Sequence, residues 1–180
     1  DEGGRRGASL GPRRNARRMT VGSSQRPAVI ERRQADRAEA DQAAWQLRVL
    51  GRFELDDGRQ TLARLRSRAA MALVARLAMA PERAHGREEL AALLWPGADA
   101  ATGRSRLRQT LSLVRAVLEP PGAPALLLAD RRTVRAAAGA FWCDAVAFER
   151  ALRERRHADA RALWGGELLP GFYDEWVVDE

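Results

Sequence analysis

A two-residue alternation of apolar and polar positions first appears in the segment WQLRVLGRFEL, residues 45–55. Leu47, Val49 and Phe53 share one parity while charged residues occupy the other, which is the pattern of a half-buried β-strand. An Asp-Asp-Gly triplet follows, and an Asp-Gly pair is a strong hairpin signal. The apolar pattern then resumes in RQTL, residues 59–62. These features predict a β-hairpin that turns at the triplet.

Two segments downstream of the hairpin have the 3.6-residue period of a helix. The first begins after Ser67, a good N-cap residue, and Pro81 ends it. Its apolar residues recur at i, i+3, i+4 and i+7: Ala70, Leu73, Val74 and Leu77. The second runs from Arg87 to Trp95 and has two acidic residues in its first turn, where the helix dipole favours negative charge.

A third, longer helix is predicted at about residues 101–118. Its core residues lie within an arc of about 40° on a helical wheel: Leu107, Leu111, Val114 and Leu118. The opposite side is small and polar: Ser105, Gln109, Ser112 and Ala116. Arginines occupy the flanks: Arg104, Arg106, Arg108 and Arg115. The segment ALLLADRRTVRAAAG then predicts a second hairpin at residues 125–137, with Arg131 and Arg132 at its tip.

The distribution of charge divides the chain into three parts. All 31 basic residues are arginine, against 24 acidic residues, for a net charge of +7. Residues 46–136 carry 16 arginines against 9 acids, and residues 137–180 carry 5 against 9. The opening segment is rich in Arg, Gly and Ala and has scattered apolar residues. We therefore expect a disordered segment at 1–44, a basic domain at 45–138 and an acidic part at 139–180.

Several classes of protein are disfavoured by composition. A single cysteine, Cys143, excludes an intramolecular disulfide framework and a multi-cysteine zinc site. No apolar run reaches the roughly 18 residues of a membrane span, and no secretory signal is recognisable. His85 and His157 have no cysteine or serine partner in pattern. We expect a cytoplasmic protein that is not an enzyme and holds no cofactor or metal.

Residues 97–105 come close to a phosphate-binding loop, because Gly97 precedes a Gly103-Arg104-Ser105 triplet. The spacing is one residue too long, arginine replaces the lysine, and the loop follows a helix where a buried strand is required. A helix pair joined by a short turn, with a basic and polar second helix, is instead typical of a helix-turn-helix that binds DNA phosphates and bases. The alternative is an ordinary helical hairpin with a solvated charged face.

The ordered segments LRVLGRFELDDG, SRAAMALVARLAMAPER, REELAALLWP and GRSRLRQTLSLVRAVLEP resemble the OmpR/PhoB-type winged helix of SARP-type bacterial transcriptional activators. FWCDAVAFERAL and ADARALWGGELLPGFYDEW are similar to the start of that family's bacterial transcriptional activator domain (BTAD). The resemblance implies an α+β fold: a winged helix-turn-helix with a four-stranded N-terminal β-sheet, a three-helix core and a C-terminal hairpin wing. An α-helical TPR-like segment follows, with helices at 144–155 and 158–164, and it is apparently truncated.

This resemblance implies a sequence-specific DNA-binding activator of transcription, associated with the nucleoid. Helix 101–118 would enter the major groove and the hairpin at 125–137 would act as the wing. Double-stranded DNA with direct repeats, RNA polymerase and a second copy of the chain are the implied partners. Where relatives carry basic residues on their first helix, this chain has Ala69 and Met71. A protein-interaction module that keeps the fold but binds DNA weakly therefore stays open. Gly103 replaces a usual alanine and is expected to weaken its helix.

The resemblance also indicates the contacts. Arg104, Arg108 and Gln109 match the family pattern R-x-x-L-R-Q, and these side chains suit guanine and adenine edges. The direction of each side chain on the helix favours contact with bases for Gln109, Ser105 and Ser112. It favours contact with phosphates for Arg104 and Arg115. Arg106 and Arg108 could contact either. Surface ion pairs and solvated turn residues are the alternatives. The predicted DNA-binding residues are Arg68, Arg104, Ser105, Arg106, Arg108, Gln109, Ser112, Arg115, Arg131 and Arg132.

Overall fold

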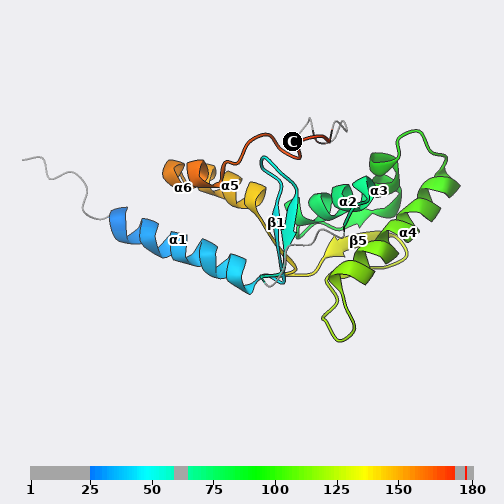
Figure 1. Ribbon diagram of the computed structural model, residues 1–180, viewed down its shortest axis with the longest axis horizontal. Helices are drawn as coiled ribbons and strands as arrows, with labels where there is room; N and C mark the ends of the chain where they lie inside the picture. Colours follow the sequence, from blue (N-terminus) through cyan, green and yellow to red (C-terminus); the bar gives the residue numbers. More distant parts are fainter. Residues whose placement is uncertain (1–24, 59–64, 173–176, 178–180) are drawn as a thin grey trace, which may run out of the picture.

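A computed structural model describes residues 25–58, 65–172 and 177. Within these residues, the sheet that contains β1 lies between two groups of helices: α2, α3 and α4 on one side, and α1, α5 and α6 on the other (Figure 1). The second sheet, which contains β5, lies among α2, α3 and α4. The fold is therefore mixed α+β, as the sequence predicts. The segments 1–24 and 59–64 lie outside the described residues, and with them part of the predicted disordered segment and the strand RQTL.

Helices α2 (Arg68–Met79), α3 (Arg87–Leu94) and α4 (Ala100–Leu118) enclose the main core. The side chain of Ser67 caps α2 by accepting a hydrogen bond from the backbone of Ala70 at 3.4 Å, as its position in the sequence predicts. The four residues predicted as the core stripe of α4 are buried: Leu107, Leu111, Val114 and Leu118. Because the stripe is apolar on one side only, the other side of α4 stays outside the core.

The start of α4 is better supported than its glycine suggests. A Cβ atom added at Gly103 would lie 3.3 Å from the Cβ of Ala91, so the glycine lies where α4 packs closely on α3. The carboxylate of Asp99 caps the helix and accepts hydrogen bonds from the backbone of Ala101 and Thr102 at 2.9 and 3.0 Å. The weak first turn that the sequence predicts therefore has both an N-cap and a packing partner.

The hairpin predicted at 125–137 is confirmed. Strands β4 (Leu127–Ala129) and β5 (Thr133–Ala136) pair antiparallel, and β3 (His85–Gly86) adds to β5 on the other side. The carboxylate of Asp130 closes the turn by accepting hydrogen bonds from the backbone of Arg132 and Thr133, both at 2.7 Å. Because β3 leads directly into α3, this three-stranded sheet places the hairpin tip beside the start of that helix.

The predicted single strand at residues 45–55 is wrong, because this segment forms two strands. Strand β1 (Trp45–Arg48) pairs antiparallel with β2 (Glu54–Asp56), with Leu47 opposite Leu55. The chain therefore reverses within the predicted strand, where Gly51 has a φ of +81°. The predicted turn at Gly58 leads into residues 59–62, which lie outside the described residues, so that turn stays a prediction. The apolar alternation continues through both arms, so it does not reveal where the strand folds back.

The strand that completes the first sheet comes from the C-terminal part of the chain. Strand β6 (Phe141–Cys143) pairs parallel with β1, and the order is β2-β1-β6. In the described residues this sheet has three strands, where the family resemblance implies four. Asp144 follows β6 directly, and its buried carboxylate accepts hydrogen bonds from the backbone of Val49 and Leu50 at 2.9 and 3.2 Å. The C-terminal part is thus joined to β1 by backbone pairing.

Helices α5 (Asp144–Arg153) and α6 (His157–Leu163) confirm the predicted helix pair. The rings of Phe148 and Trp164 contact one another with their centroids 5.4 Å apart. Two large apolar side chains of the pair stay exposed: Leu152 on α5 at 43% and Trp164 after α6 at 56%. This helix pair therefore keeps apolar side chains on its surface.

The predicted disorder is wrong for residues 25–42, which form helix α1 (Gln25–Gln42). Two of its acids form ion pairs with arginines of the C-terminal helix pair. Arg150 lies 2.7 Å from both Asp36 and Glu39, and Arg156 lies 2.8 Å from Asp36. The Arg156 side chain is 4% exposed. Composition indicates disorder here because few apolar residues are present, whereas the helix is held by charges on α5 and on Arg156 at the start of α6.

Candidate nucleic-acid interface

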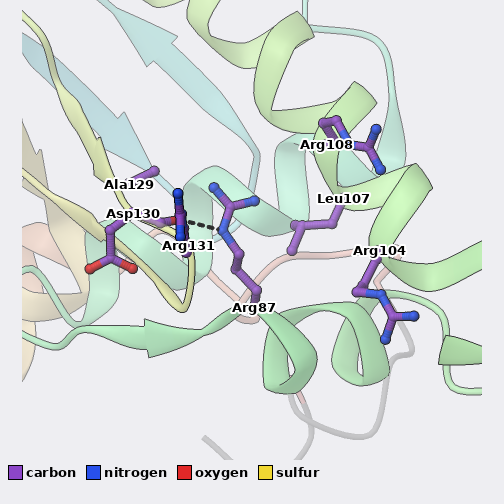
Figure 2. Close-up of a pocket in the computed structure, with 7 residues that line it drawn as sticks. All are labelled: Arg87, Arg104, Leu107, Arg108, Ala129, Asp130 and Arg131. Atoms are coloured by element: carbon purple, nitrogen blue, oxygen red, sulfur yellow. Dashed lines mark hydrogen bonds between the residues drawn. The ribbon is translucent and has the colours of Figure 1, made fainter. Parts of the chain in front are cut away.

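A groove of about 610 Å³ separates α4 from the tip of the β4–β5 hairpin (Figure 2). Three separate elements contribute to it: the start of α3, the N-terminal half of α4 and the turn of the hairpin. Its lining residues are Arg87, Arg104, Leu107, Arg108, Ala129, Asp130 and Arg131. Four guanidinium groups against one carboxylate make this groove strongly positive, and guanidinium groups match phosphate oxygens in a bidentate geometry.

Arg87 ties the hairpin tip to α3. Its backbone N–H donates to the carbonyl of Arg132 at 2.8 Å, and its side-chain Nε donates to the carbonyl of Asp130 at 2.8 Å (Figure 2). Sequence reasoning placed this residue at a helix start but did not assign it to the site. Its position in the groove depends on the pairing of β3 with β5, which no local pattern shows.

Three residues of the predicted set, Arg104, Arg108 and Arg131, line the groove. The nearest acid to Arg104 is Glu88 at 3.8 Å, and the two side chains are 52% and 86% exposed. An ion pair this exposed contributes little, so Arg104 is able to exchange it for another anion. The carboxylate of Asp130 is occupied by its own turn, where hydrogen bonds from the backbone of Thr133 hold its pKa below the ordinary value.

The side of α4 that faces away from the core forms a second surface. Of the predicted residues there, Arg106, Gln109 and Ser112 are exposed and Ser105 is half-buried. The sequence of α4 contains no acidic residue. A polyanion approaching this surface therefore meets no negative charge from the helix itself.

The structure places Arg115 and Arg68 outside the groove. Arg115 donates a hydrogen bond to the carbonyl of Leu127 at 3.1 Å and lies 3.8 Å from Glu119, so it fastens α4 to β4. The guanidinium of Arg68, at the start of α2, lies 5.0 Å from the ring centroid of Phe172. Arg132, the last of the set, is exposed at the hairpin tip.

Two titratable groups weighed for chemistry in the sequence, Cys143 and His85, are buried. Cys143 is buried, and burial raises the pKa of its thiol to about 12, which removes thiolate reactivity at neutral pH. His85 is fully buried, and burial followed by the charge of Arg76 lowers its pKa. The described ranges contain no group of three or more His, Cys, Asp and Glu residues that could hold a metal ion. Across the same ranges, every helix is too short or too polar to cross a bilayer.

Comparison with known proteins identifies a shared fold. No protein-family model matches the sequence, and no curated protein matches it. Among solved structures, the chain is similar to EmbR of Mycobacterium tuberculosis in complex with a low-affinity phosphopeptide, with a TM-score of 0.60 and 18% identity over 76% of this chain. The two chains share a fold. The present chain spans 40% of the length of the EmbR chain.

Proposed function

We propose that this chain is a sequence-specific DNA-binding regulator of transcription of the SARP type. Helices α2 to α4 with the β4–β5 hairpin supply the parts of a winged helix-turn-helix, and α5 with α6 supplies the start of a TPR-like activator domain. The sequence resemblance and the likeness to EmbR, a SARP-family regulator, support the same assignment. The proposed boundary lies between residues 138 and 139, although β6 returns to the first sheet.

The groove beside α4 carries this proposal. In the proposed complex α4 lies in the major groove of DNA, where its outward face meets base edges. The arginines of the groove, which include Arg87 and Arg104, take phosphates of the flanking backbone. The hairpin tip, with Arg131 and Arg132, reaches the adjacent minor groove or backbone. Four arginines that line one groove beside an acid-free helix suit a polyanion better than a small metabolite.

The activator role and the remaining partners belong to the same proposal. Binding to direct repeats, contact with RNA polymerase and contact between protomers are supported by the sequence resemblance. The exposed side chains of Leu152 and Trp164 add apolar surface on the helix pair that such protein contacts require. The corresponding location is the bacterial cytoplasm, at the nucleoid.

Salt dependence of binding to a random duplex tests the electrostatic part. Each phosphate contact contributes a slope of about −0.9 to the plot of log affinity against log salt, so four contacts reduce the affinity on the order of 150-fold between 50 and 200 mM salt. Fluorescence anisotropy of a labelled duplex measures this. The double variant Arg104→Gln/Arg108→Gln should reduce the slope by about two units. The matched control is Arg52→Gln/Arg153→Gln, two exposed arginines outside the groove, and it should leave the slope unchanged.

Selection of bound DNA from a random pool tests the sequence-specific part. We expect an enriched direct repeat, because two copies of the chain in head-to-tail order read the same half-site twice. Binding that is weak, insensitive to salt and without any enriched sequence would overturn the proposal.

A protein-interaction module with weak DNA binding is the second candidate. One observation favours it: the guanidinium of Arg68 lies over the ring of Phe172, and the neighbouring positions Ala69 and Met71 on α2 are uncharged. Helix α2 therefore offers a DNA backbone less positive charge than relatives are expected to offer. In this case the random-duplex measurement shows weak affinity, whereas Leu152 and Trp164 remain as contact residues for a protein partner.

A further inference from the structure

The two exposed sides of α4 differ in chemistry. Arg104 and Arg108 lie on the groove side, and Arg115 is fastened to the carbonyl of Leu127. The outward side is composed mainly of small, amide and aliphatic side chains: Ser105, Gln109, Ser112, Leu113 and Ala116. Arg106 is the one arginine of α4 that is left for the outward side. Three of the four arginines of α4, which could otherwise contact guanine, therefore face the groove or β4.

Leu113 is the unusual member of the outward side. The large apolar side chains exposed in the described part of the chain are Leu113, Leu128, Leu152 and Trp164, and among these Leu113 alone belongs to α4. It is 43% exposed, and the core of α4 is already filled by its buried stripe. An aliphatic side chain on a surface that is proposed to enter the major groove has one apolar partner there, the C5-methyl group of thymine.

Leu113 also stands in register with Gln109. The two residues are four positions apart, so they lie on the same face and about 6 Å apart along the helix axis. That separation corresponds to less than two base-pair steps of roughly 3.4 Å. A carboxamide pairs with N6 and N7 of adenine, so both side chains select the same type of base pair at neighbouring steps.

We infer that Gln109 and Leu113 together read adjacent A·T pairs, Gln109 through the adenine edge and Leu113 through the thymine methyl group, while the groove arginines hold phosphates. This inference rests on the proposed function and adds the base preference of the site. Arg106 lies seven residues before Leu113 on the same side and extends the reading surface toward the start of α4.

The thymine contact is tested with a duplex that carries the site selected from the random pool. Each thymine is replaced in turn by deoxyuridine, which lacks only the C5-methyl group. Loss of one buried methyl contact should reduce the affinity of the wild-type chain about four-fold at one or two positions. The variant Leu113→Ser should bind thymine and uracil duplexes equally at those positions. Leu152→Ser is the matched control, because Leu152 has the same 43% exposure but lies on α5, outside the reading surface; whatever its effect on contacts between protomers, the ratio of its affinities for thymine and uracil duplexes should equal that of the wild type.

The adenine contact is tested in the same duplex with 7-deazaadenine, which lacks the N7 acceptor. Affinity of the wild-type chain should decrease about ten-fold at one position, and Gln109→Ala should be indifferent to the replacement. A circular dichroism spectrum identical to that of the wild type shows that each variant is folded, as expected for exposed positions.

The outcomes separate the inference from the proposed function. If a sequence is enriched and binding depends on salt, but no uracil replacement matters or the effect persists in Leu113→Ser, the reading by Leu113 is wrong while the function stands. An effect of 7-deazaadenine that persists in Gln109→Ala contradicts the adenine contact in the same way. If no sequence is enriched, both the proposed function and the inference are overturned.

Discussion

Replacing Gly51 by alanine should destabilise the protein far more than the same replacement at Gly58. Both glycines have a left-handed backbone, with φ of +81° and +78°. A left-handed alanine costs roughly 1–2 kcal/mol, so this part of the free energy of unfolding is lost in both variants. The difference in stability between the two variants therefore reports how much the surroundings of Gly51 depend on the absence of a side chain there.

The surroundings of the two glycines differ. A Cβ atom at Gly51 would overlap the carbonyl group of Gly165 and lie 2.5 Å from its carbon, whereas none of the described residues comes within 4 Å of a Cβ atom at Gly58. Because the atoms that this Cβ would meet belong to the backbone of Gly165, the overlap can be removed only if the two chain segments move apart. Overpacking of this kind costs about 1–3 kcal/mol.

Separation would also break backbone hydrogen bonds between the two segments. The N–H of Gly51 donates to the carbonyl of Glu167 at 2.8 Å, and the N–H of Leu169 donates to the carbonyl of Val49 at 2.7 Å. Each bond contributes about 1 kcal/mol. The expected loss in the free energy of unfolding is about 4–7 kcal/mol for Gly51→Ala and about 1–2 kcal/mol for Gly58→Ala.

Urea denaturation followed by tryptophan fluorescence measures the difference. With a slope of about 2 kcal/mol per molar urea, the midpoint of Gly51→Ala should lie more than about 1 M below that of Gly58→Ala. Equal midpoints for the two variants would refute the reasoning, because they would show that residues 165–169 do not pack against the β1–β2 hairpin in solution.

Two further predictions concern buried ionisable groups and use the same urea assay. Burial lowers the pKa of His85 below its ordinary 6.5, so the unfolded state binds the proton more tightly; stability should be full above pH 6.5 and decrease below it by at most about 1.4 kcal/mol per pH unit. His85→Gln should flatten this dependence; a slope unchanged in His85→Gln contradicts the assignment. Asp144→Ala removes the acceptor of the buried N–H groups of Val49 and Leu50 and should cost about 3 kcal/mol. Asp144→Asn keeps one of the two acceptor oxygens but turns its NH2 group toward the other backbone N–H, so it should recover only part of this loss; a loss near zero in Asp144→Ala would show that these hydrogen bonds contribute nothing.

Local patterns in the sequence were sufficient for several elements. The stripe from Leu107 to Leu118 repeats with the period of a helix, so its burial follows from the pattern alone. Ser67 before α2 and the Asp130 turn of the second hairpin have their hydrogen-bond partners within three residues. Elements of this kind are determined over short distances along the chain, and sequence reasoning identified them correctly.

Long-range contacts decided what sequence reasoning missed. The turn at Gly51 packs against the backbone of Gly165, more than a hundred residues away, and α1 is held by ion pairs with Arg150 and Arg156. Composition could not reveal a helix that depends on charges so far along the chain. The sequence alone predicts that Gly103 weakens α4, whereas the structure shows that this glycine lies where α4 packs closely on α3.

The candidate site shows the same division. The sequence by itself determined a basic helix with one apolar stripe, because a periodic pattern specifies which side of a helix is buried. Only the tertiary structure decided which arginines line the groove, because the pairing of β3 with β5 brings Arg87 to it, whereas Arg115 lies outside it and donates a hydrogen bond to the carbonyl of Leu127. Periodicity defines the direction of a side chain about its own helix, whereas its partners depend on how separate elements pack.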